Sequence, residues 1–228
     1  MGDLSLYGAD EPTRIIAVRH GETAWNAESR LQGQLDIPLN ERGRDQARRV
    51  GLALLHEQPE VIYSSDLSRA RETAQAIARS AGLPLSTDAG LRERCFGIFE
   101  GNTYAEVEQR WPDEALRWRQ RDPAWGPEAG ETLQGFFDRC IATATRLASA
   151  HPGQTVVLVA HGGVLDCLYR AASRITLNAP RTWELGNTSV NRLLYTGEGF
   201  TLIGWGDVHH LDDEALDESS DAAVPAPT

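Results

Sequence analysis

Apolar residues fall into short unbroken runs and into stripes of helical spacing, and the two patterns alternate along the chain. The runs predict strands over 13–19, 61–64 and 155–160, followed by a hairpin of strands over 189–196 and 200–205. The stripes predict helices over 40–55, 66–81, 131–151 and 163–172. Residues 20–39 lack a sustained period and contain glycine and proline, so we expect a long loop there.

Strands that alternate with helices favour a three-layer α/β fold, in which a mostly parallel mixed sheet lies between helices on both faces. We expect a single domain over 13–210, preceded by an N-terminal tail over 1–12. The acidic stretch 211–228, rich in Ala, Ser and Pro, predicts a disordered tail. Residues 102–130 hold three tryptophans and little periodicity, which indicates a lid-like insertion rather than a core element.

Two of the predicted strands end in the same way. His20 follows the run that closes at Arg19, and His161 follows the run that closes at Ala160. Ligands of parallel sheets bind beyond the carboxyl ends of the strands, so both imidazoles are expected at one edge of the sheet. A pair of histidines at such an edge is the first indication of a catalytic site.

Charge and composition exclude several classes of function. The net charge of −11 argues against nucleic-acid and anionic-membrane partners. All 22 cationic residues are arginine, so a Walker A lysine and a Schiff-base lysine are both excluded, and any anion must be held by arginine, histidine or backbone amides. Three cysteines at scattered spacings and a first segment without a signal-peptide pattern lead us to expect a cytoplasmic protein.

The strand ends belong to a longer ordered set of motifs. The set consists of Arg19-His20-Gly21-Glu22-Thr23, then Asn26, 31–39, 64–70, 91–93 and 160–162. This order and spacing resemble the signature of the histidine phosphatase superfamily, whose fold is phosphoglycerate mutase-like. The resemblance implies a nucleophile at His20, phosphate-binding arginines at Arg19 and Arg69, an acid/base at Glu93 and a second histidine at His161.

These residue types suit phosphoryl transfer on physical grounds as well. A neutral imidazole is a good nucleophile and leaving group near pH 7, and guanidinium forks bind phosphate oxygens in pairs. Glu93 can protonate a leaving oxygen and later accept a proton from water, and His161 would add a third positive charge if protonated. We expect no cofactor.

Further contacts are expected around this centre. Thr23, Asn26, Gln32 and Gly33 in the long loop and Gly162 beside the second histidine are predicted to bind substrate. His209 and His210 are adjacent in sequence and lack the spacing of metal ligands, so we predict no metal site.

The sequence therefore predicts a metal-independent histidine acid phosphatase-type hydrolase that acts on a small phosphomonoester through a phosphohistidine. Mutase-type phosphoryl transfer stays open, although Tyr104 stands where the mutases of the family carry a substrate-binding lysine. A non-catalytic phospholigand-binding protein and a metal-dependent hydrolase are further alternatives. The natural substrate and the oligomeric state, a homodimer included, are left open.

Overall fold

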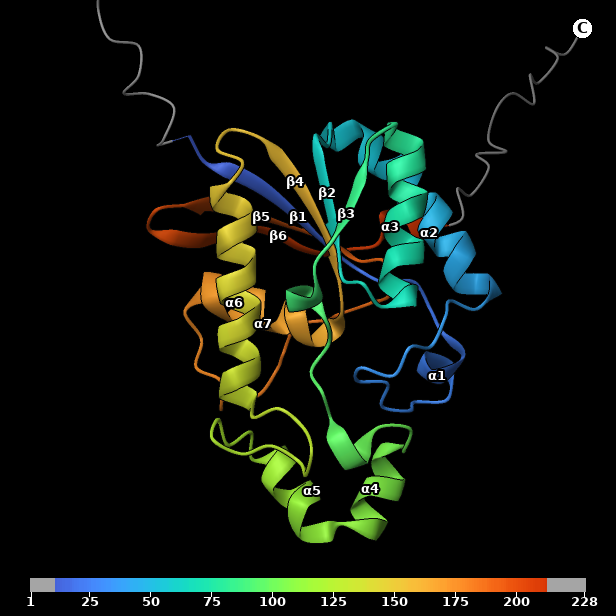
Figure 1. Cartoon of the computed structure of the whole chain (residues 1–228), viewed down its shortest axis with the longest axis vertical. Coiled ribbons are helices and arrows are strands. Elements are labelled where there is room, and N and C mark those ends of the chain that lie inside the picture. Colours follow the sequence, from blue (N-terminus) through green and yellow to red (C-terminus); the bar gives the residue numbers. More distant parts are fainter. Residues whose placement is uncertain (1–10, 213–228) are drawn as a thin grey trace, which may run out of the picture.

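The computed structural model describes residues 11–212. Most of the two predicted tails, 1–12 and 211–228, lies outside the described residues. Figure 1 shows the described chain as helices packed around a central sheet, with two further helices extending beyond one end of it.

The sheet has six strands within the described residues, in the order β3-β2-β4-β1-β5-β6. The strands are β1 (Thr13–Arg19), β2 (Val61–Ser64), β3 (Leu85–Thr87), β4 (Thr155–Ala160), β5 (Val190–Thr196) and β6 (Gly199–Asp207). The first four in space are parallel to one another, whereas β5 and β6 are antiparallel and form one edge. The predicted mostly parallel mixed sheet is confirmed.

Helices cover both faces of this sheet. The larger ones are α2 (Glu41–Ala53), α3 (Ser68–Ala81), α6 (Leu133–Ser149) and α7 (Gly162–Ser173). Alternate side chains of a strand point to opposite faces, so Ile15 and Ala17 of β1 pack with α6 and α7, whereas Ile16 and Val18 pack with α2 and α3. The two buried clusters explain the unbroken apolar runs, and the three-layer architecture is confirmed.

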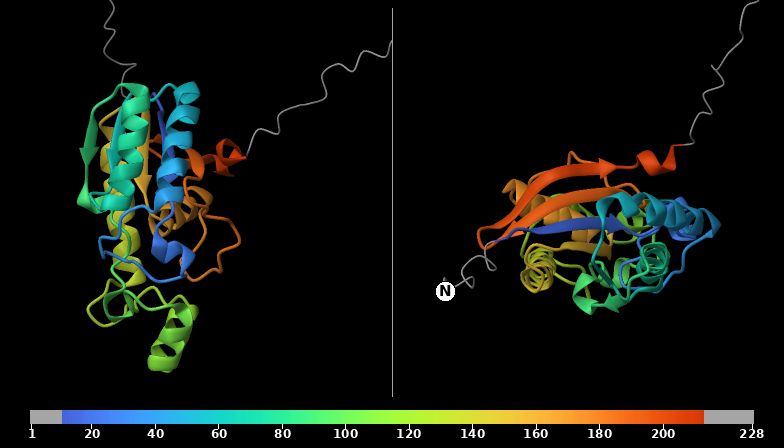
Figure 2. Two further views of the ribbon diagram at one scale, coloured as in Figure 1. Left: turned by 90° about the vertical axis from the view of Figure 1, so that its right-hand side faces the viewer. Right: turned by 90° about the horizontal axis from the view of Figure 1, so that it is seen from above.

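Smaller helices lie near the carboxyl ends of the strands. They are α1 (Ala24–Ala27), α4 (Tyr104–Arg110) and α5 (Pro112–Arg119), and single 3₁₀ turns span Leu54–Glu57, Ala89–Leu91, Gly97–Phe99 and His209–Leu211. Helices α4 and α5 project beyond the sheet at the bottom of Figures 1 and 2. Three tryptophans in or beside these helices surround Phe99: Trp118 of α5 has its ring centroid 5.5 Å away, Trp111 between α4 and α5 lies 5.6 Å away, and Trp125 after α5 lies 6.1 Å away.

The register of the central strands fixes where the two histidines lie. Arg19 of β1 pairs with Ala160 of β4, and the His20 amide donates a hydrogen bond to the Ala160 carbonyl at 3.0 Å. The residues that follow the two strands are therefore neighbours at the same edge. The backbone therefore places His20 and His161 at the same edge of the sheet, as expected.

Candidate active site

His20 and His161 face each other at the carboxyl edge of the sheet. Their ring centroids are 5.2 Å apart and the rings are tilted by 57°. Nδ1 of His20 lies 2.7 Å from the Gly21 carbonyl oxygen. A carbonyl can only accept, so Nδ1 carries the hydrogen and the neutral ring presents a lone pair at Nε2.

The surroundings keep both rings neutral. Burial, followed by the charges of Arg69 and Arg19, lowers the pKa of His20 well below its usual 6.5. Burial and the charge of Arg69 lower the pKa of His161 in the same direction. At neutral pH His20 is therefore in the form required of a nucleophile. The third positive charge considered for His161 is absent in this protonation state.

Two arginines reach this pair from different elements. Arg19 ends β1 and donates through Nη1 to the Leu185 carbonyl. Arg69, in the first turn of α3, donates through Nη1 to the Leu35 carbonyl at 2.9 Å and through Nη2 to the Gly33 carbonyl at 2.7 Å. Burial lowers the pKa of Arg69 to about 10, so it remains cationic at neutral pH.

Several buried nitrogens here have no hydrogen-bond partner within residues 11–212: Nε of Arg19, Nε of Arg69, and Nδ1 and Nε2 of His161. Buried polar groups in native proteins are nearly always paired, so unpaired ones call for an explanation. Neutral His161 carries one N–H donor and one lone pair, so this donor and the two arginine Nε groups form, around a neutral His20, a site suited to an anion with several oxygens. A phosphoryl group meets that description.

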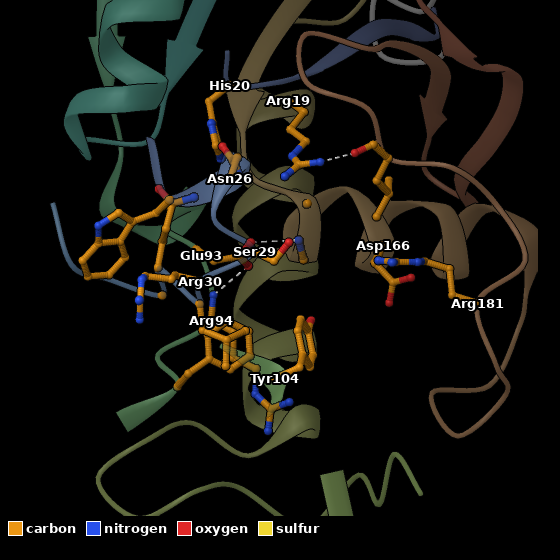
Figure 3. A pocket seen from close by; sticks show the side chains of 18 of the residues that line it. Arg19, His20, Asn26, Ser29, Arg30, Glu93, Arg94, Tyr104, Asp166 and Arg181 are labelled. Carbon is orange, nitrogen blue, oxygen red and sulfur yellow. Dashed lines mark hydrogen bonds between the residues drawn. The ribbon is translucent and has the colours of Figure 1, made fainter. Parts of the chain in front are cut away.

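Glu93 is held against the first turn of α7. Its Oε2 accepts the Gly163 amide at 3.0 Å, and its Oε1 accepts the Arg94 amide at 2.8 Å. A Cβ at position 163 would lie 2.2 Å from Oε1, so the carboxylate can occupy this position only because residue 163 is glycine. Figure 3 shows Glu93 below His20 and Arg19 in the pocket.

A cavity of about 710 Å³ opens onto this centre. It is lined by eight of the ten residues predicted as site residues: Arg19, His20, Asn26, Gln32, Gly33, Arg69, Glu93 and Gly162. The other two are not lining residues. His161 is fully buried beside His20, and the fully buried Thr23 is the N-cap of α1.

Thr23 instead organises the long loop. Its hydroxyl accepts the Asn26 amide at 3.1 Å and lies 3.0 Å from the Gln32 side-chain oxygen. Asn187 adds a contact that sequence reasoning missed, since its side-chain amide donates to the His20 carbonyl at 2.9 Å. Direct contact of Thr23 with a substrate stays a prediction, and its observed role is to position the loop.

Further charged residues line the cavity without having been predicted. They are Arg30, Arg94, Arg121, Asp166, Arg181 and Glu184. Arg181 and Asn187 come from the irregular segment between α7 and β5, where no motif or period singles them out. Only the folded chain brings them to the strand ends.

His209 and His210 do not join this site. His209 pairs with Asp207 at 2.8 Å, and His210 Nε2 lies 3.2 Å from the Thr188 hydroxyl. Across residues 11–212, no group of three or more His, Cys, Asp and Glu side chains is arranged to hold a metal ion. In the same part of the chain, no helix combines the length and the apolarity needed to span a membrane.

Comparisons with known proteins agree on one family. The family model described as histidine phosphatase superfamily (branch 1) matches residues 15–208. Phosphoglycerate mutase-like protein 4 of Arabidopsis thaliana is 42% identical over 209 residues, which are 90% of each chain.

Solved structures of phosphatases have the same fold. A mycobacterial glucosyl-3-phosphoglycerate phosphatase in complex with VO3 matches with a TM-score of 0.78 and 34% identity, over 86% of this chain and 99% of that one. Phosphoserine phosphatase of Entamoeba histolytica in complex with 3-phosphoglyceric acid matches with a TM-score of 0.78 and 26% identity, over 87% and 99%.

Proposed function

Because the chain belongs to the histidine phosphatase superfamily, we propose that it is a phosphomonoester hydrolase in which His20 carries the phosphoryl group between two transfers. The observation that carries the proposal is the neutral His20 ring, which lies beside His161 in a site where the Nε donors of Arg19 and Arg69 and both ring nitrogens of His161 are buried and unpaired. The substrate is a small phosphorylated metabolite, and the location of the enzyme is cytoplasmic.

In the first transfer, Nε2 of His20 attacks phosphorus, and the bond between phosphorus and the ester oxygen breaks. Glu93, in its protonated form, gives its proton to the departing oxygen, so an alcohol leaves. The phosphoryl group is then bonded to Nε2, and Nδ1 keeps its hydrogen bond to the Gly21 carbonyl. This bond holds the ring in the tautomer that attacks.

In the second transfer, water attacks phosphorus and gives one proton to the Glu93 carboxylate. The bond between phosphorus and Nε2 breaks, inorganic phosphate leaves, and both His20 and protonated Glu93 are regenerated. The same carboxylate thus serves as acid and then as base, which requires it to stay near the in-line axis. Its two backbone hydrogen bonds, from Gly163 and Arg94, restrain it there.

The charges of the transferring group are balanced by protein side chains. Guanidinium groups at Arg19 and Arg69 supply donors to the equatorial oxygens, where negative charge is spread in a loose transition state. Their burial strengthens these contacts because the two guanidinium groups are shielded from bulk water. We propose that these groups suffice and that the reaction proceeds without a metal ion.

Mutase-type transfer is the second candidate, favoured by the mutase-like relative from Arabidopsis thaliana. A mutase must retain a bisphosphorylated intermediate while the substrate turns over, which calls for many fixed cations. The cavity carries Tyr104 where the mutases of the family carry a lysine, and the chain has no lysine to replace it. We therefore favour hydrolysis over transfer.

The test is release of inorganic phosphate from a panel of phosphomonoesters, with excess chelator present. We expect turnover that chelator does not reduce and that His20→Ala abolishes. Interconversion of 3- and 2-phosphoglycerate is measured in parallel with a bisphosphorylated primer. Isomerisation that outpaces phosphate release would support the mutase, and loss of phosphate release on chelation would contradict the metal-free reaction.

A further inference from the structure

Glu93 lies in a stretch of chain without regular secondary structure. Residues 92–96 belong to neither a helix nor a strand, so their backbone groups cannot pair within a ladder or a helical turn. The stretch runs from β3 toward α4 and passes α6 on the way (Figure 1). The position of the proposed acid/base therefore depends on contacts with other segments, and the two hydrogen bonds to its carboxylate are only part of them.

Arg139, on α6, contacts the backbone of this stretch at several points. Its Nη1 donates to the Gly90 carbonyl at 2.9 Å and to the Arg92 carbonyl at 3.0 Å, and its Nη2 donates to the Glu93 carbonyl at 3.3 Å. The Glu93 carbonyl also accepts the Gln34 side-chain amide at 3.1 Å. One arginine side chain thus holds the backbone before Glu93 and at Glu93 itself.

Glu131 holds Arg139 and also contacts the chain on the other side of Glu93. The ion pair is bidentate, with Nε donating to Oε1 and Nη2 donating to Oε2, both at 2.8 Å. The same Oε2 accepts the Cys95 amide at 2.8 Å, and the Glu131 amide donates to the Cys95 carbonyl at 2.9 Å. Arg139 and Glu131, which we call the clamp, therefore hold the backbone on both sides of Glu93.

The clamp uses every N–H group of the Arg139 guanidinium. A guanidinium has five N–H donors in a fixed planar arrangement. Here they donate to three backbone carbonyls and to both oxygens of one carboxylate. The two side chains are only 24% and 26% exposed, so solvent screens this pair less than an ion pair on the surface. A lysine has three donors on one nitrogen and could not make the same set of contacts.

We propose that Arg139 and Glu131 are positioning residues for proton transfer, which keep the Glu93 carboxylate within reach of the ester oxygen and of the attacking water. Neither residue lines the cavity, so both act through Glu93. Proton transfer needs the donor within hydrogen-bond distance, and a displacement of about 1 Å can cost ~10²-fold in rate. The inference rests on the proposed role of Glu93 and adds the residues that make this role possible.

The test compares Arg139→Gln with the wild type on an alkyl phosphate and on p-nitrophenyl phosphate. For both esters kcat/KM reports the first transfer, in which only the alkyl oxygen needs a proton from Glu93. We expect kcat/KM to fall at least ~10-fold for the alkyl phosphate and less than ~2-fold for p-nitrophenyl phosphate. The loss should be smaller than in Glu93→Gln, because both hydrogen bonds to the carboxylate remain.

Two further variants sharpen the comparison. Arg139→Lys keeps the charge and part of the contacts, so its loss on the alkyl phosphate should be intermediate. Arg146→Gln is the matched control, since it breaks an exposed ion pair between the same helix and Asp88 and should leave both kcat/KM values unchanged. When Glu93→Gln is already present, Arg139→Gln should cause no further loss on the alkyl phosphate.

The outcomes separate the inference from the proposed function. Equal losses of Arg139→Gln on both esters, wild-type kcat/KM values, or an additive loss in the double variant would overturn the inference. If Glu93→Gln itself does not discriminate between the esters, Glu93 is not the acid and the inference fails with that assignment. Thermal unfolding checks that each variant is folded. If Arg139→Gln does not fold, Arg139→Lys and Glu131→Gln carry the same comparison.

Discussion

Gly163 offers a way to move the Glu93 carboxylate without changing its chemistry. In Gly163→Ala the new Cβ would lie 2.2 Å from Oε1 of Glu93 and 3.0 Å from ring carbons of Phe136, whereas ordinary contact begins at 3.4 Å. Oε1 ends a flexible side chain, so the carboxylate should retreat by about 1 Å, a displacement that can cost ~10²-fold in rate. The 3.0 Å hydrogen bond from the Gly163 amide is lost or lengthened in the process.

The displaced carboxylate should impair proton transfer and leave the fold intact. For an alkyl phosphate, whose leaving oxygen needs a proton, we expect kcat/KM to fall by ~10²-fold, or about 2.7 kcal/mol. For p-nitrophenyl phosphate, whose leaving group departs unaided, kcat/KM should fall much less. Alanine is a better helix former than glycine by about 1 kcal/mol, so α7 should not be weakened and the Tm should stay close to that of the wild type.

The assay is a double-mutant cycle of Gly163→Ala with Glu93→Gln on both substrates. Both changes act through one carboxylate, so the double variant should be no slower on the alkyl phosphate than Glu93→Gln alone. Gly204→Ala, where a Cβ meets no atom within 4 Å, is the control. Wild-type kcat/KM in Gly163→Ala, or additive losses in the double variant, would refute the assignment of Glu93 as the proton carrier.

Two further predictions concern the phosphate site. Arg69→Lys removes the guanidinium fork that also donates to the Gly33 and Leu35 carbonyls, so kcat/KM should fall at least ~10-fold. Arg79→Lys, on the same helix, is the control. An unchanged kcat/KM in Arg69→Lys would mean that Arg69 only holds the loop. The pKa values of His20 and His161 are lowered in the folded protein, so the unfolded chain binds protons more readily below pH 6.5. The free energy of unfolding should therefore fall by about 1.4 kcal/mol per pH unit for each histidine as the pH drops below 6.5, and urea titrations of His161→Gln should show a smaller slope. Equal slopes in the variant and the wild type would contradict the neutral, buried state of His161.

The elements that could be predicted are those whose residues carry a periodic signal of their own. β1 and β4 are buried on both faces and therefore read as unbroken apolar runs. β3 was not predicted because its three residues, Leu85–Thr87, are too short and too exposed to form such a run. α1 was predicted as part of a loop, since its four residues are fixed by the capping box of Thr23 and Asn26 rather than by an apolar stripe.

The residues of the site also fall into those that the sequence could predict and those that it could not. His20 and His161 could be placed together from sequence because parallel strands bring their carboxyl ends to one edge. The contact of Glu93 with Gly163 and the approach of Arg181 depend on how separate segments pack, which no local pattern encodes. A resemblance to known motifs supplied Glu93 as a candidate, whereas nothing in the sequence distinguished Arg181 from other arginines.

The central claim is that His20 carries the phosphoryl group, and trapping that intermediate tests it most directly. Rapid acid-free quenching of the enzyme with a labelled phosphomonoester should yield a protein adduct that is stable to alkali and labile to acid, formed and lost at rates compatible with turnover. Mapping should place the label on His20, and His20→Ala should show neither the adduct nor the activity. Turnover without an adduct, a label on another residue, or an active His20→Ala variant would contradict the account.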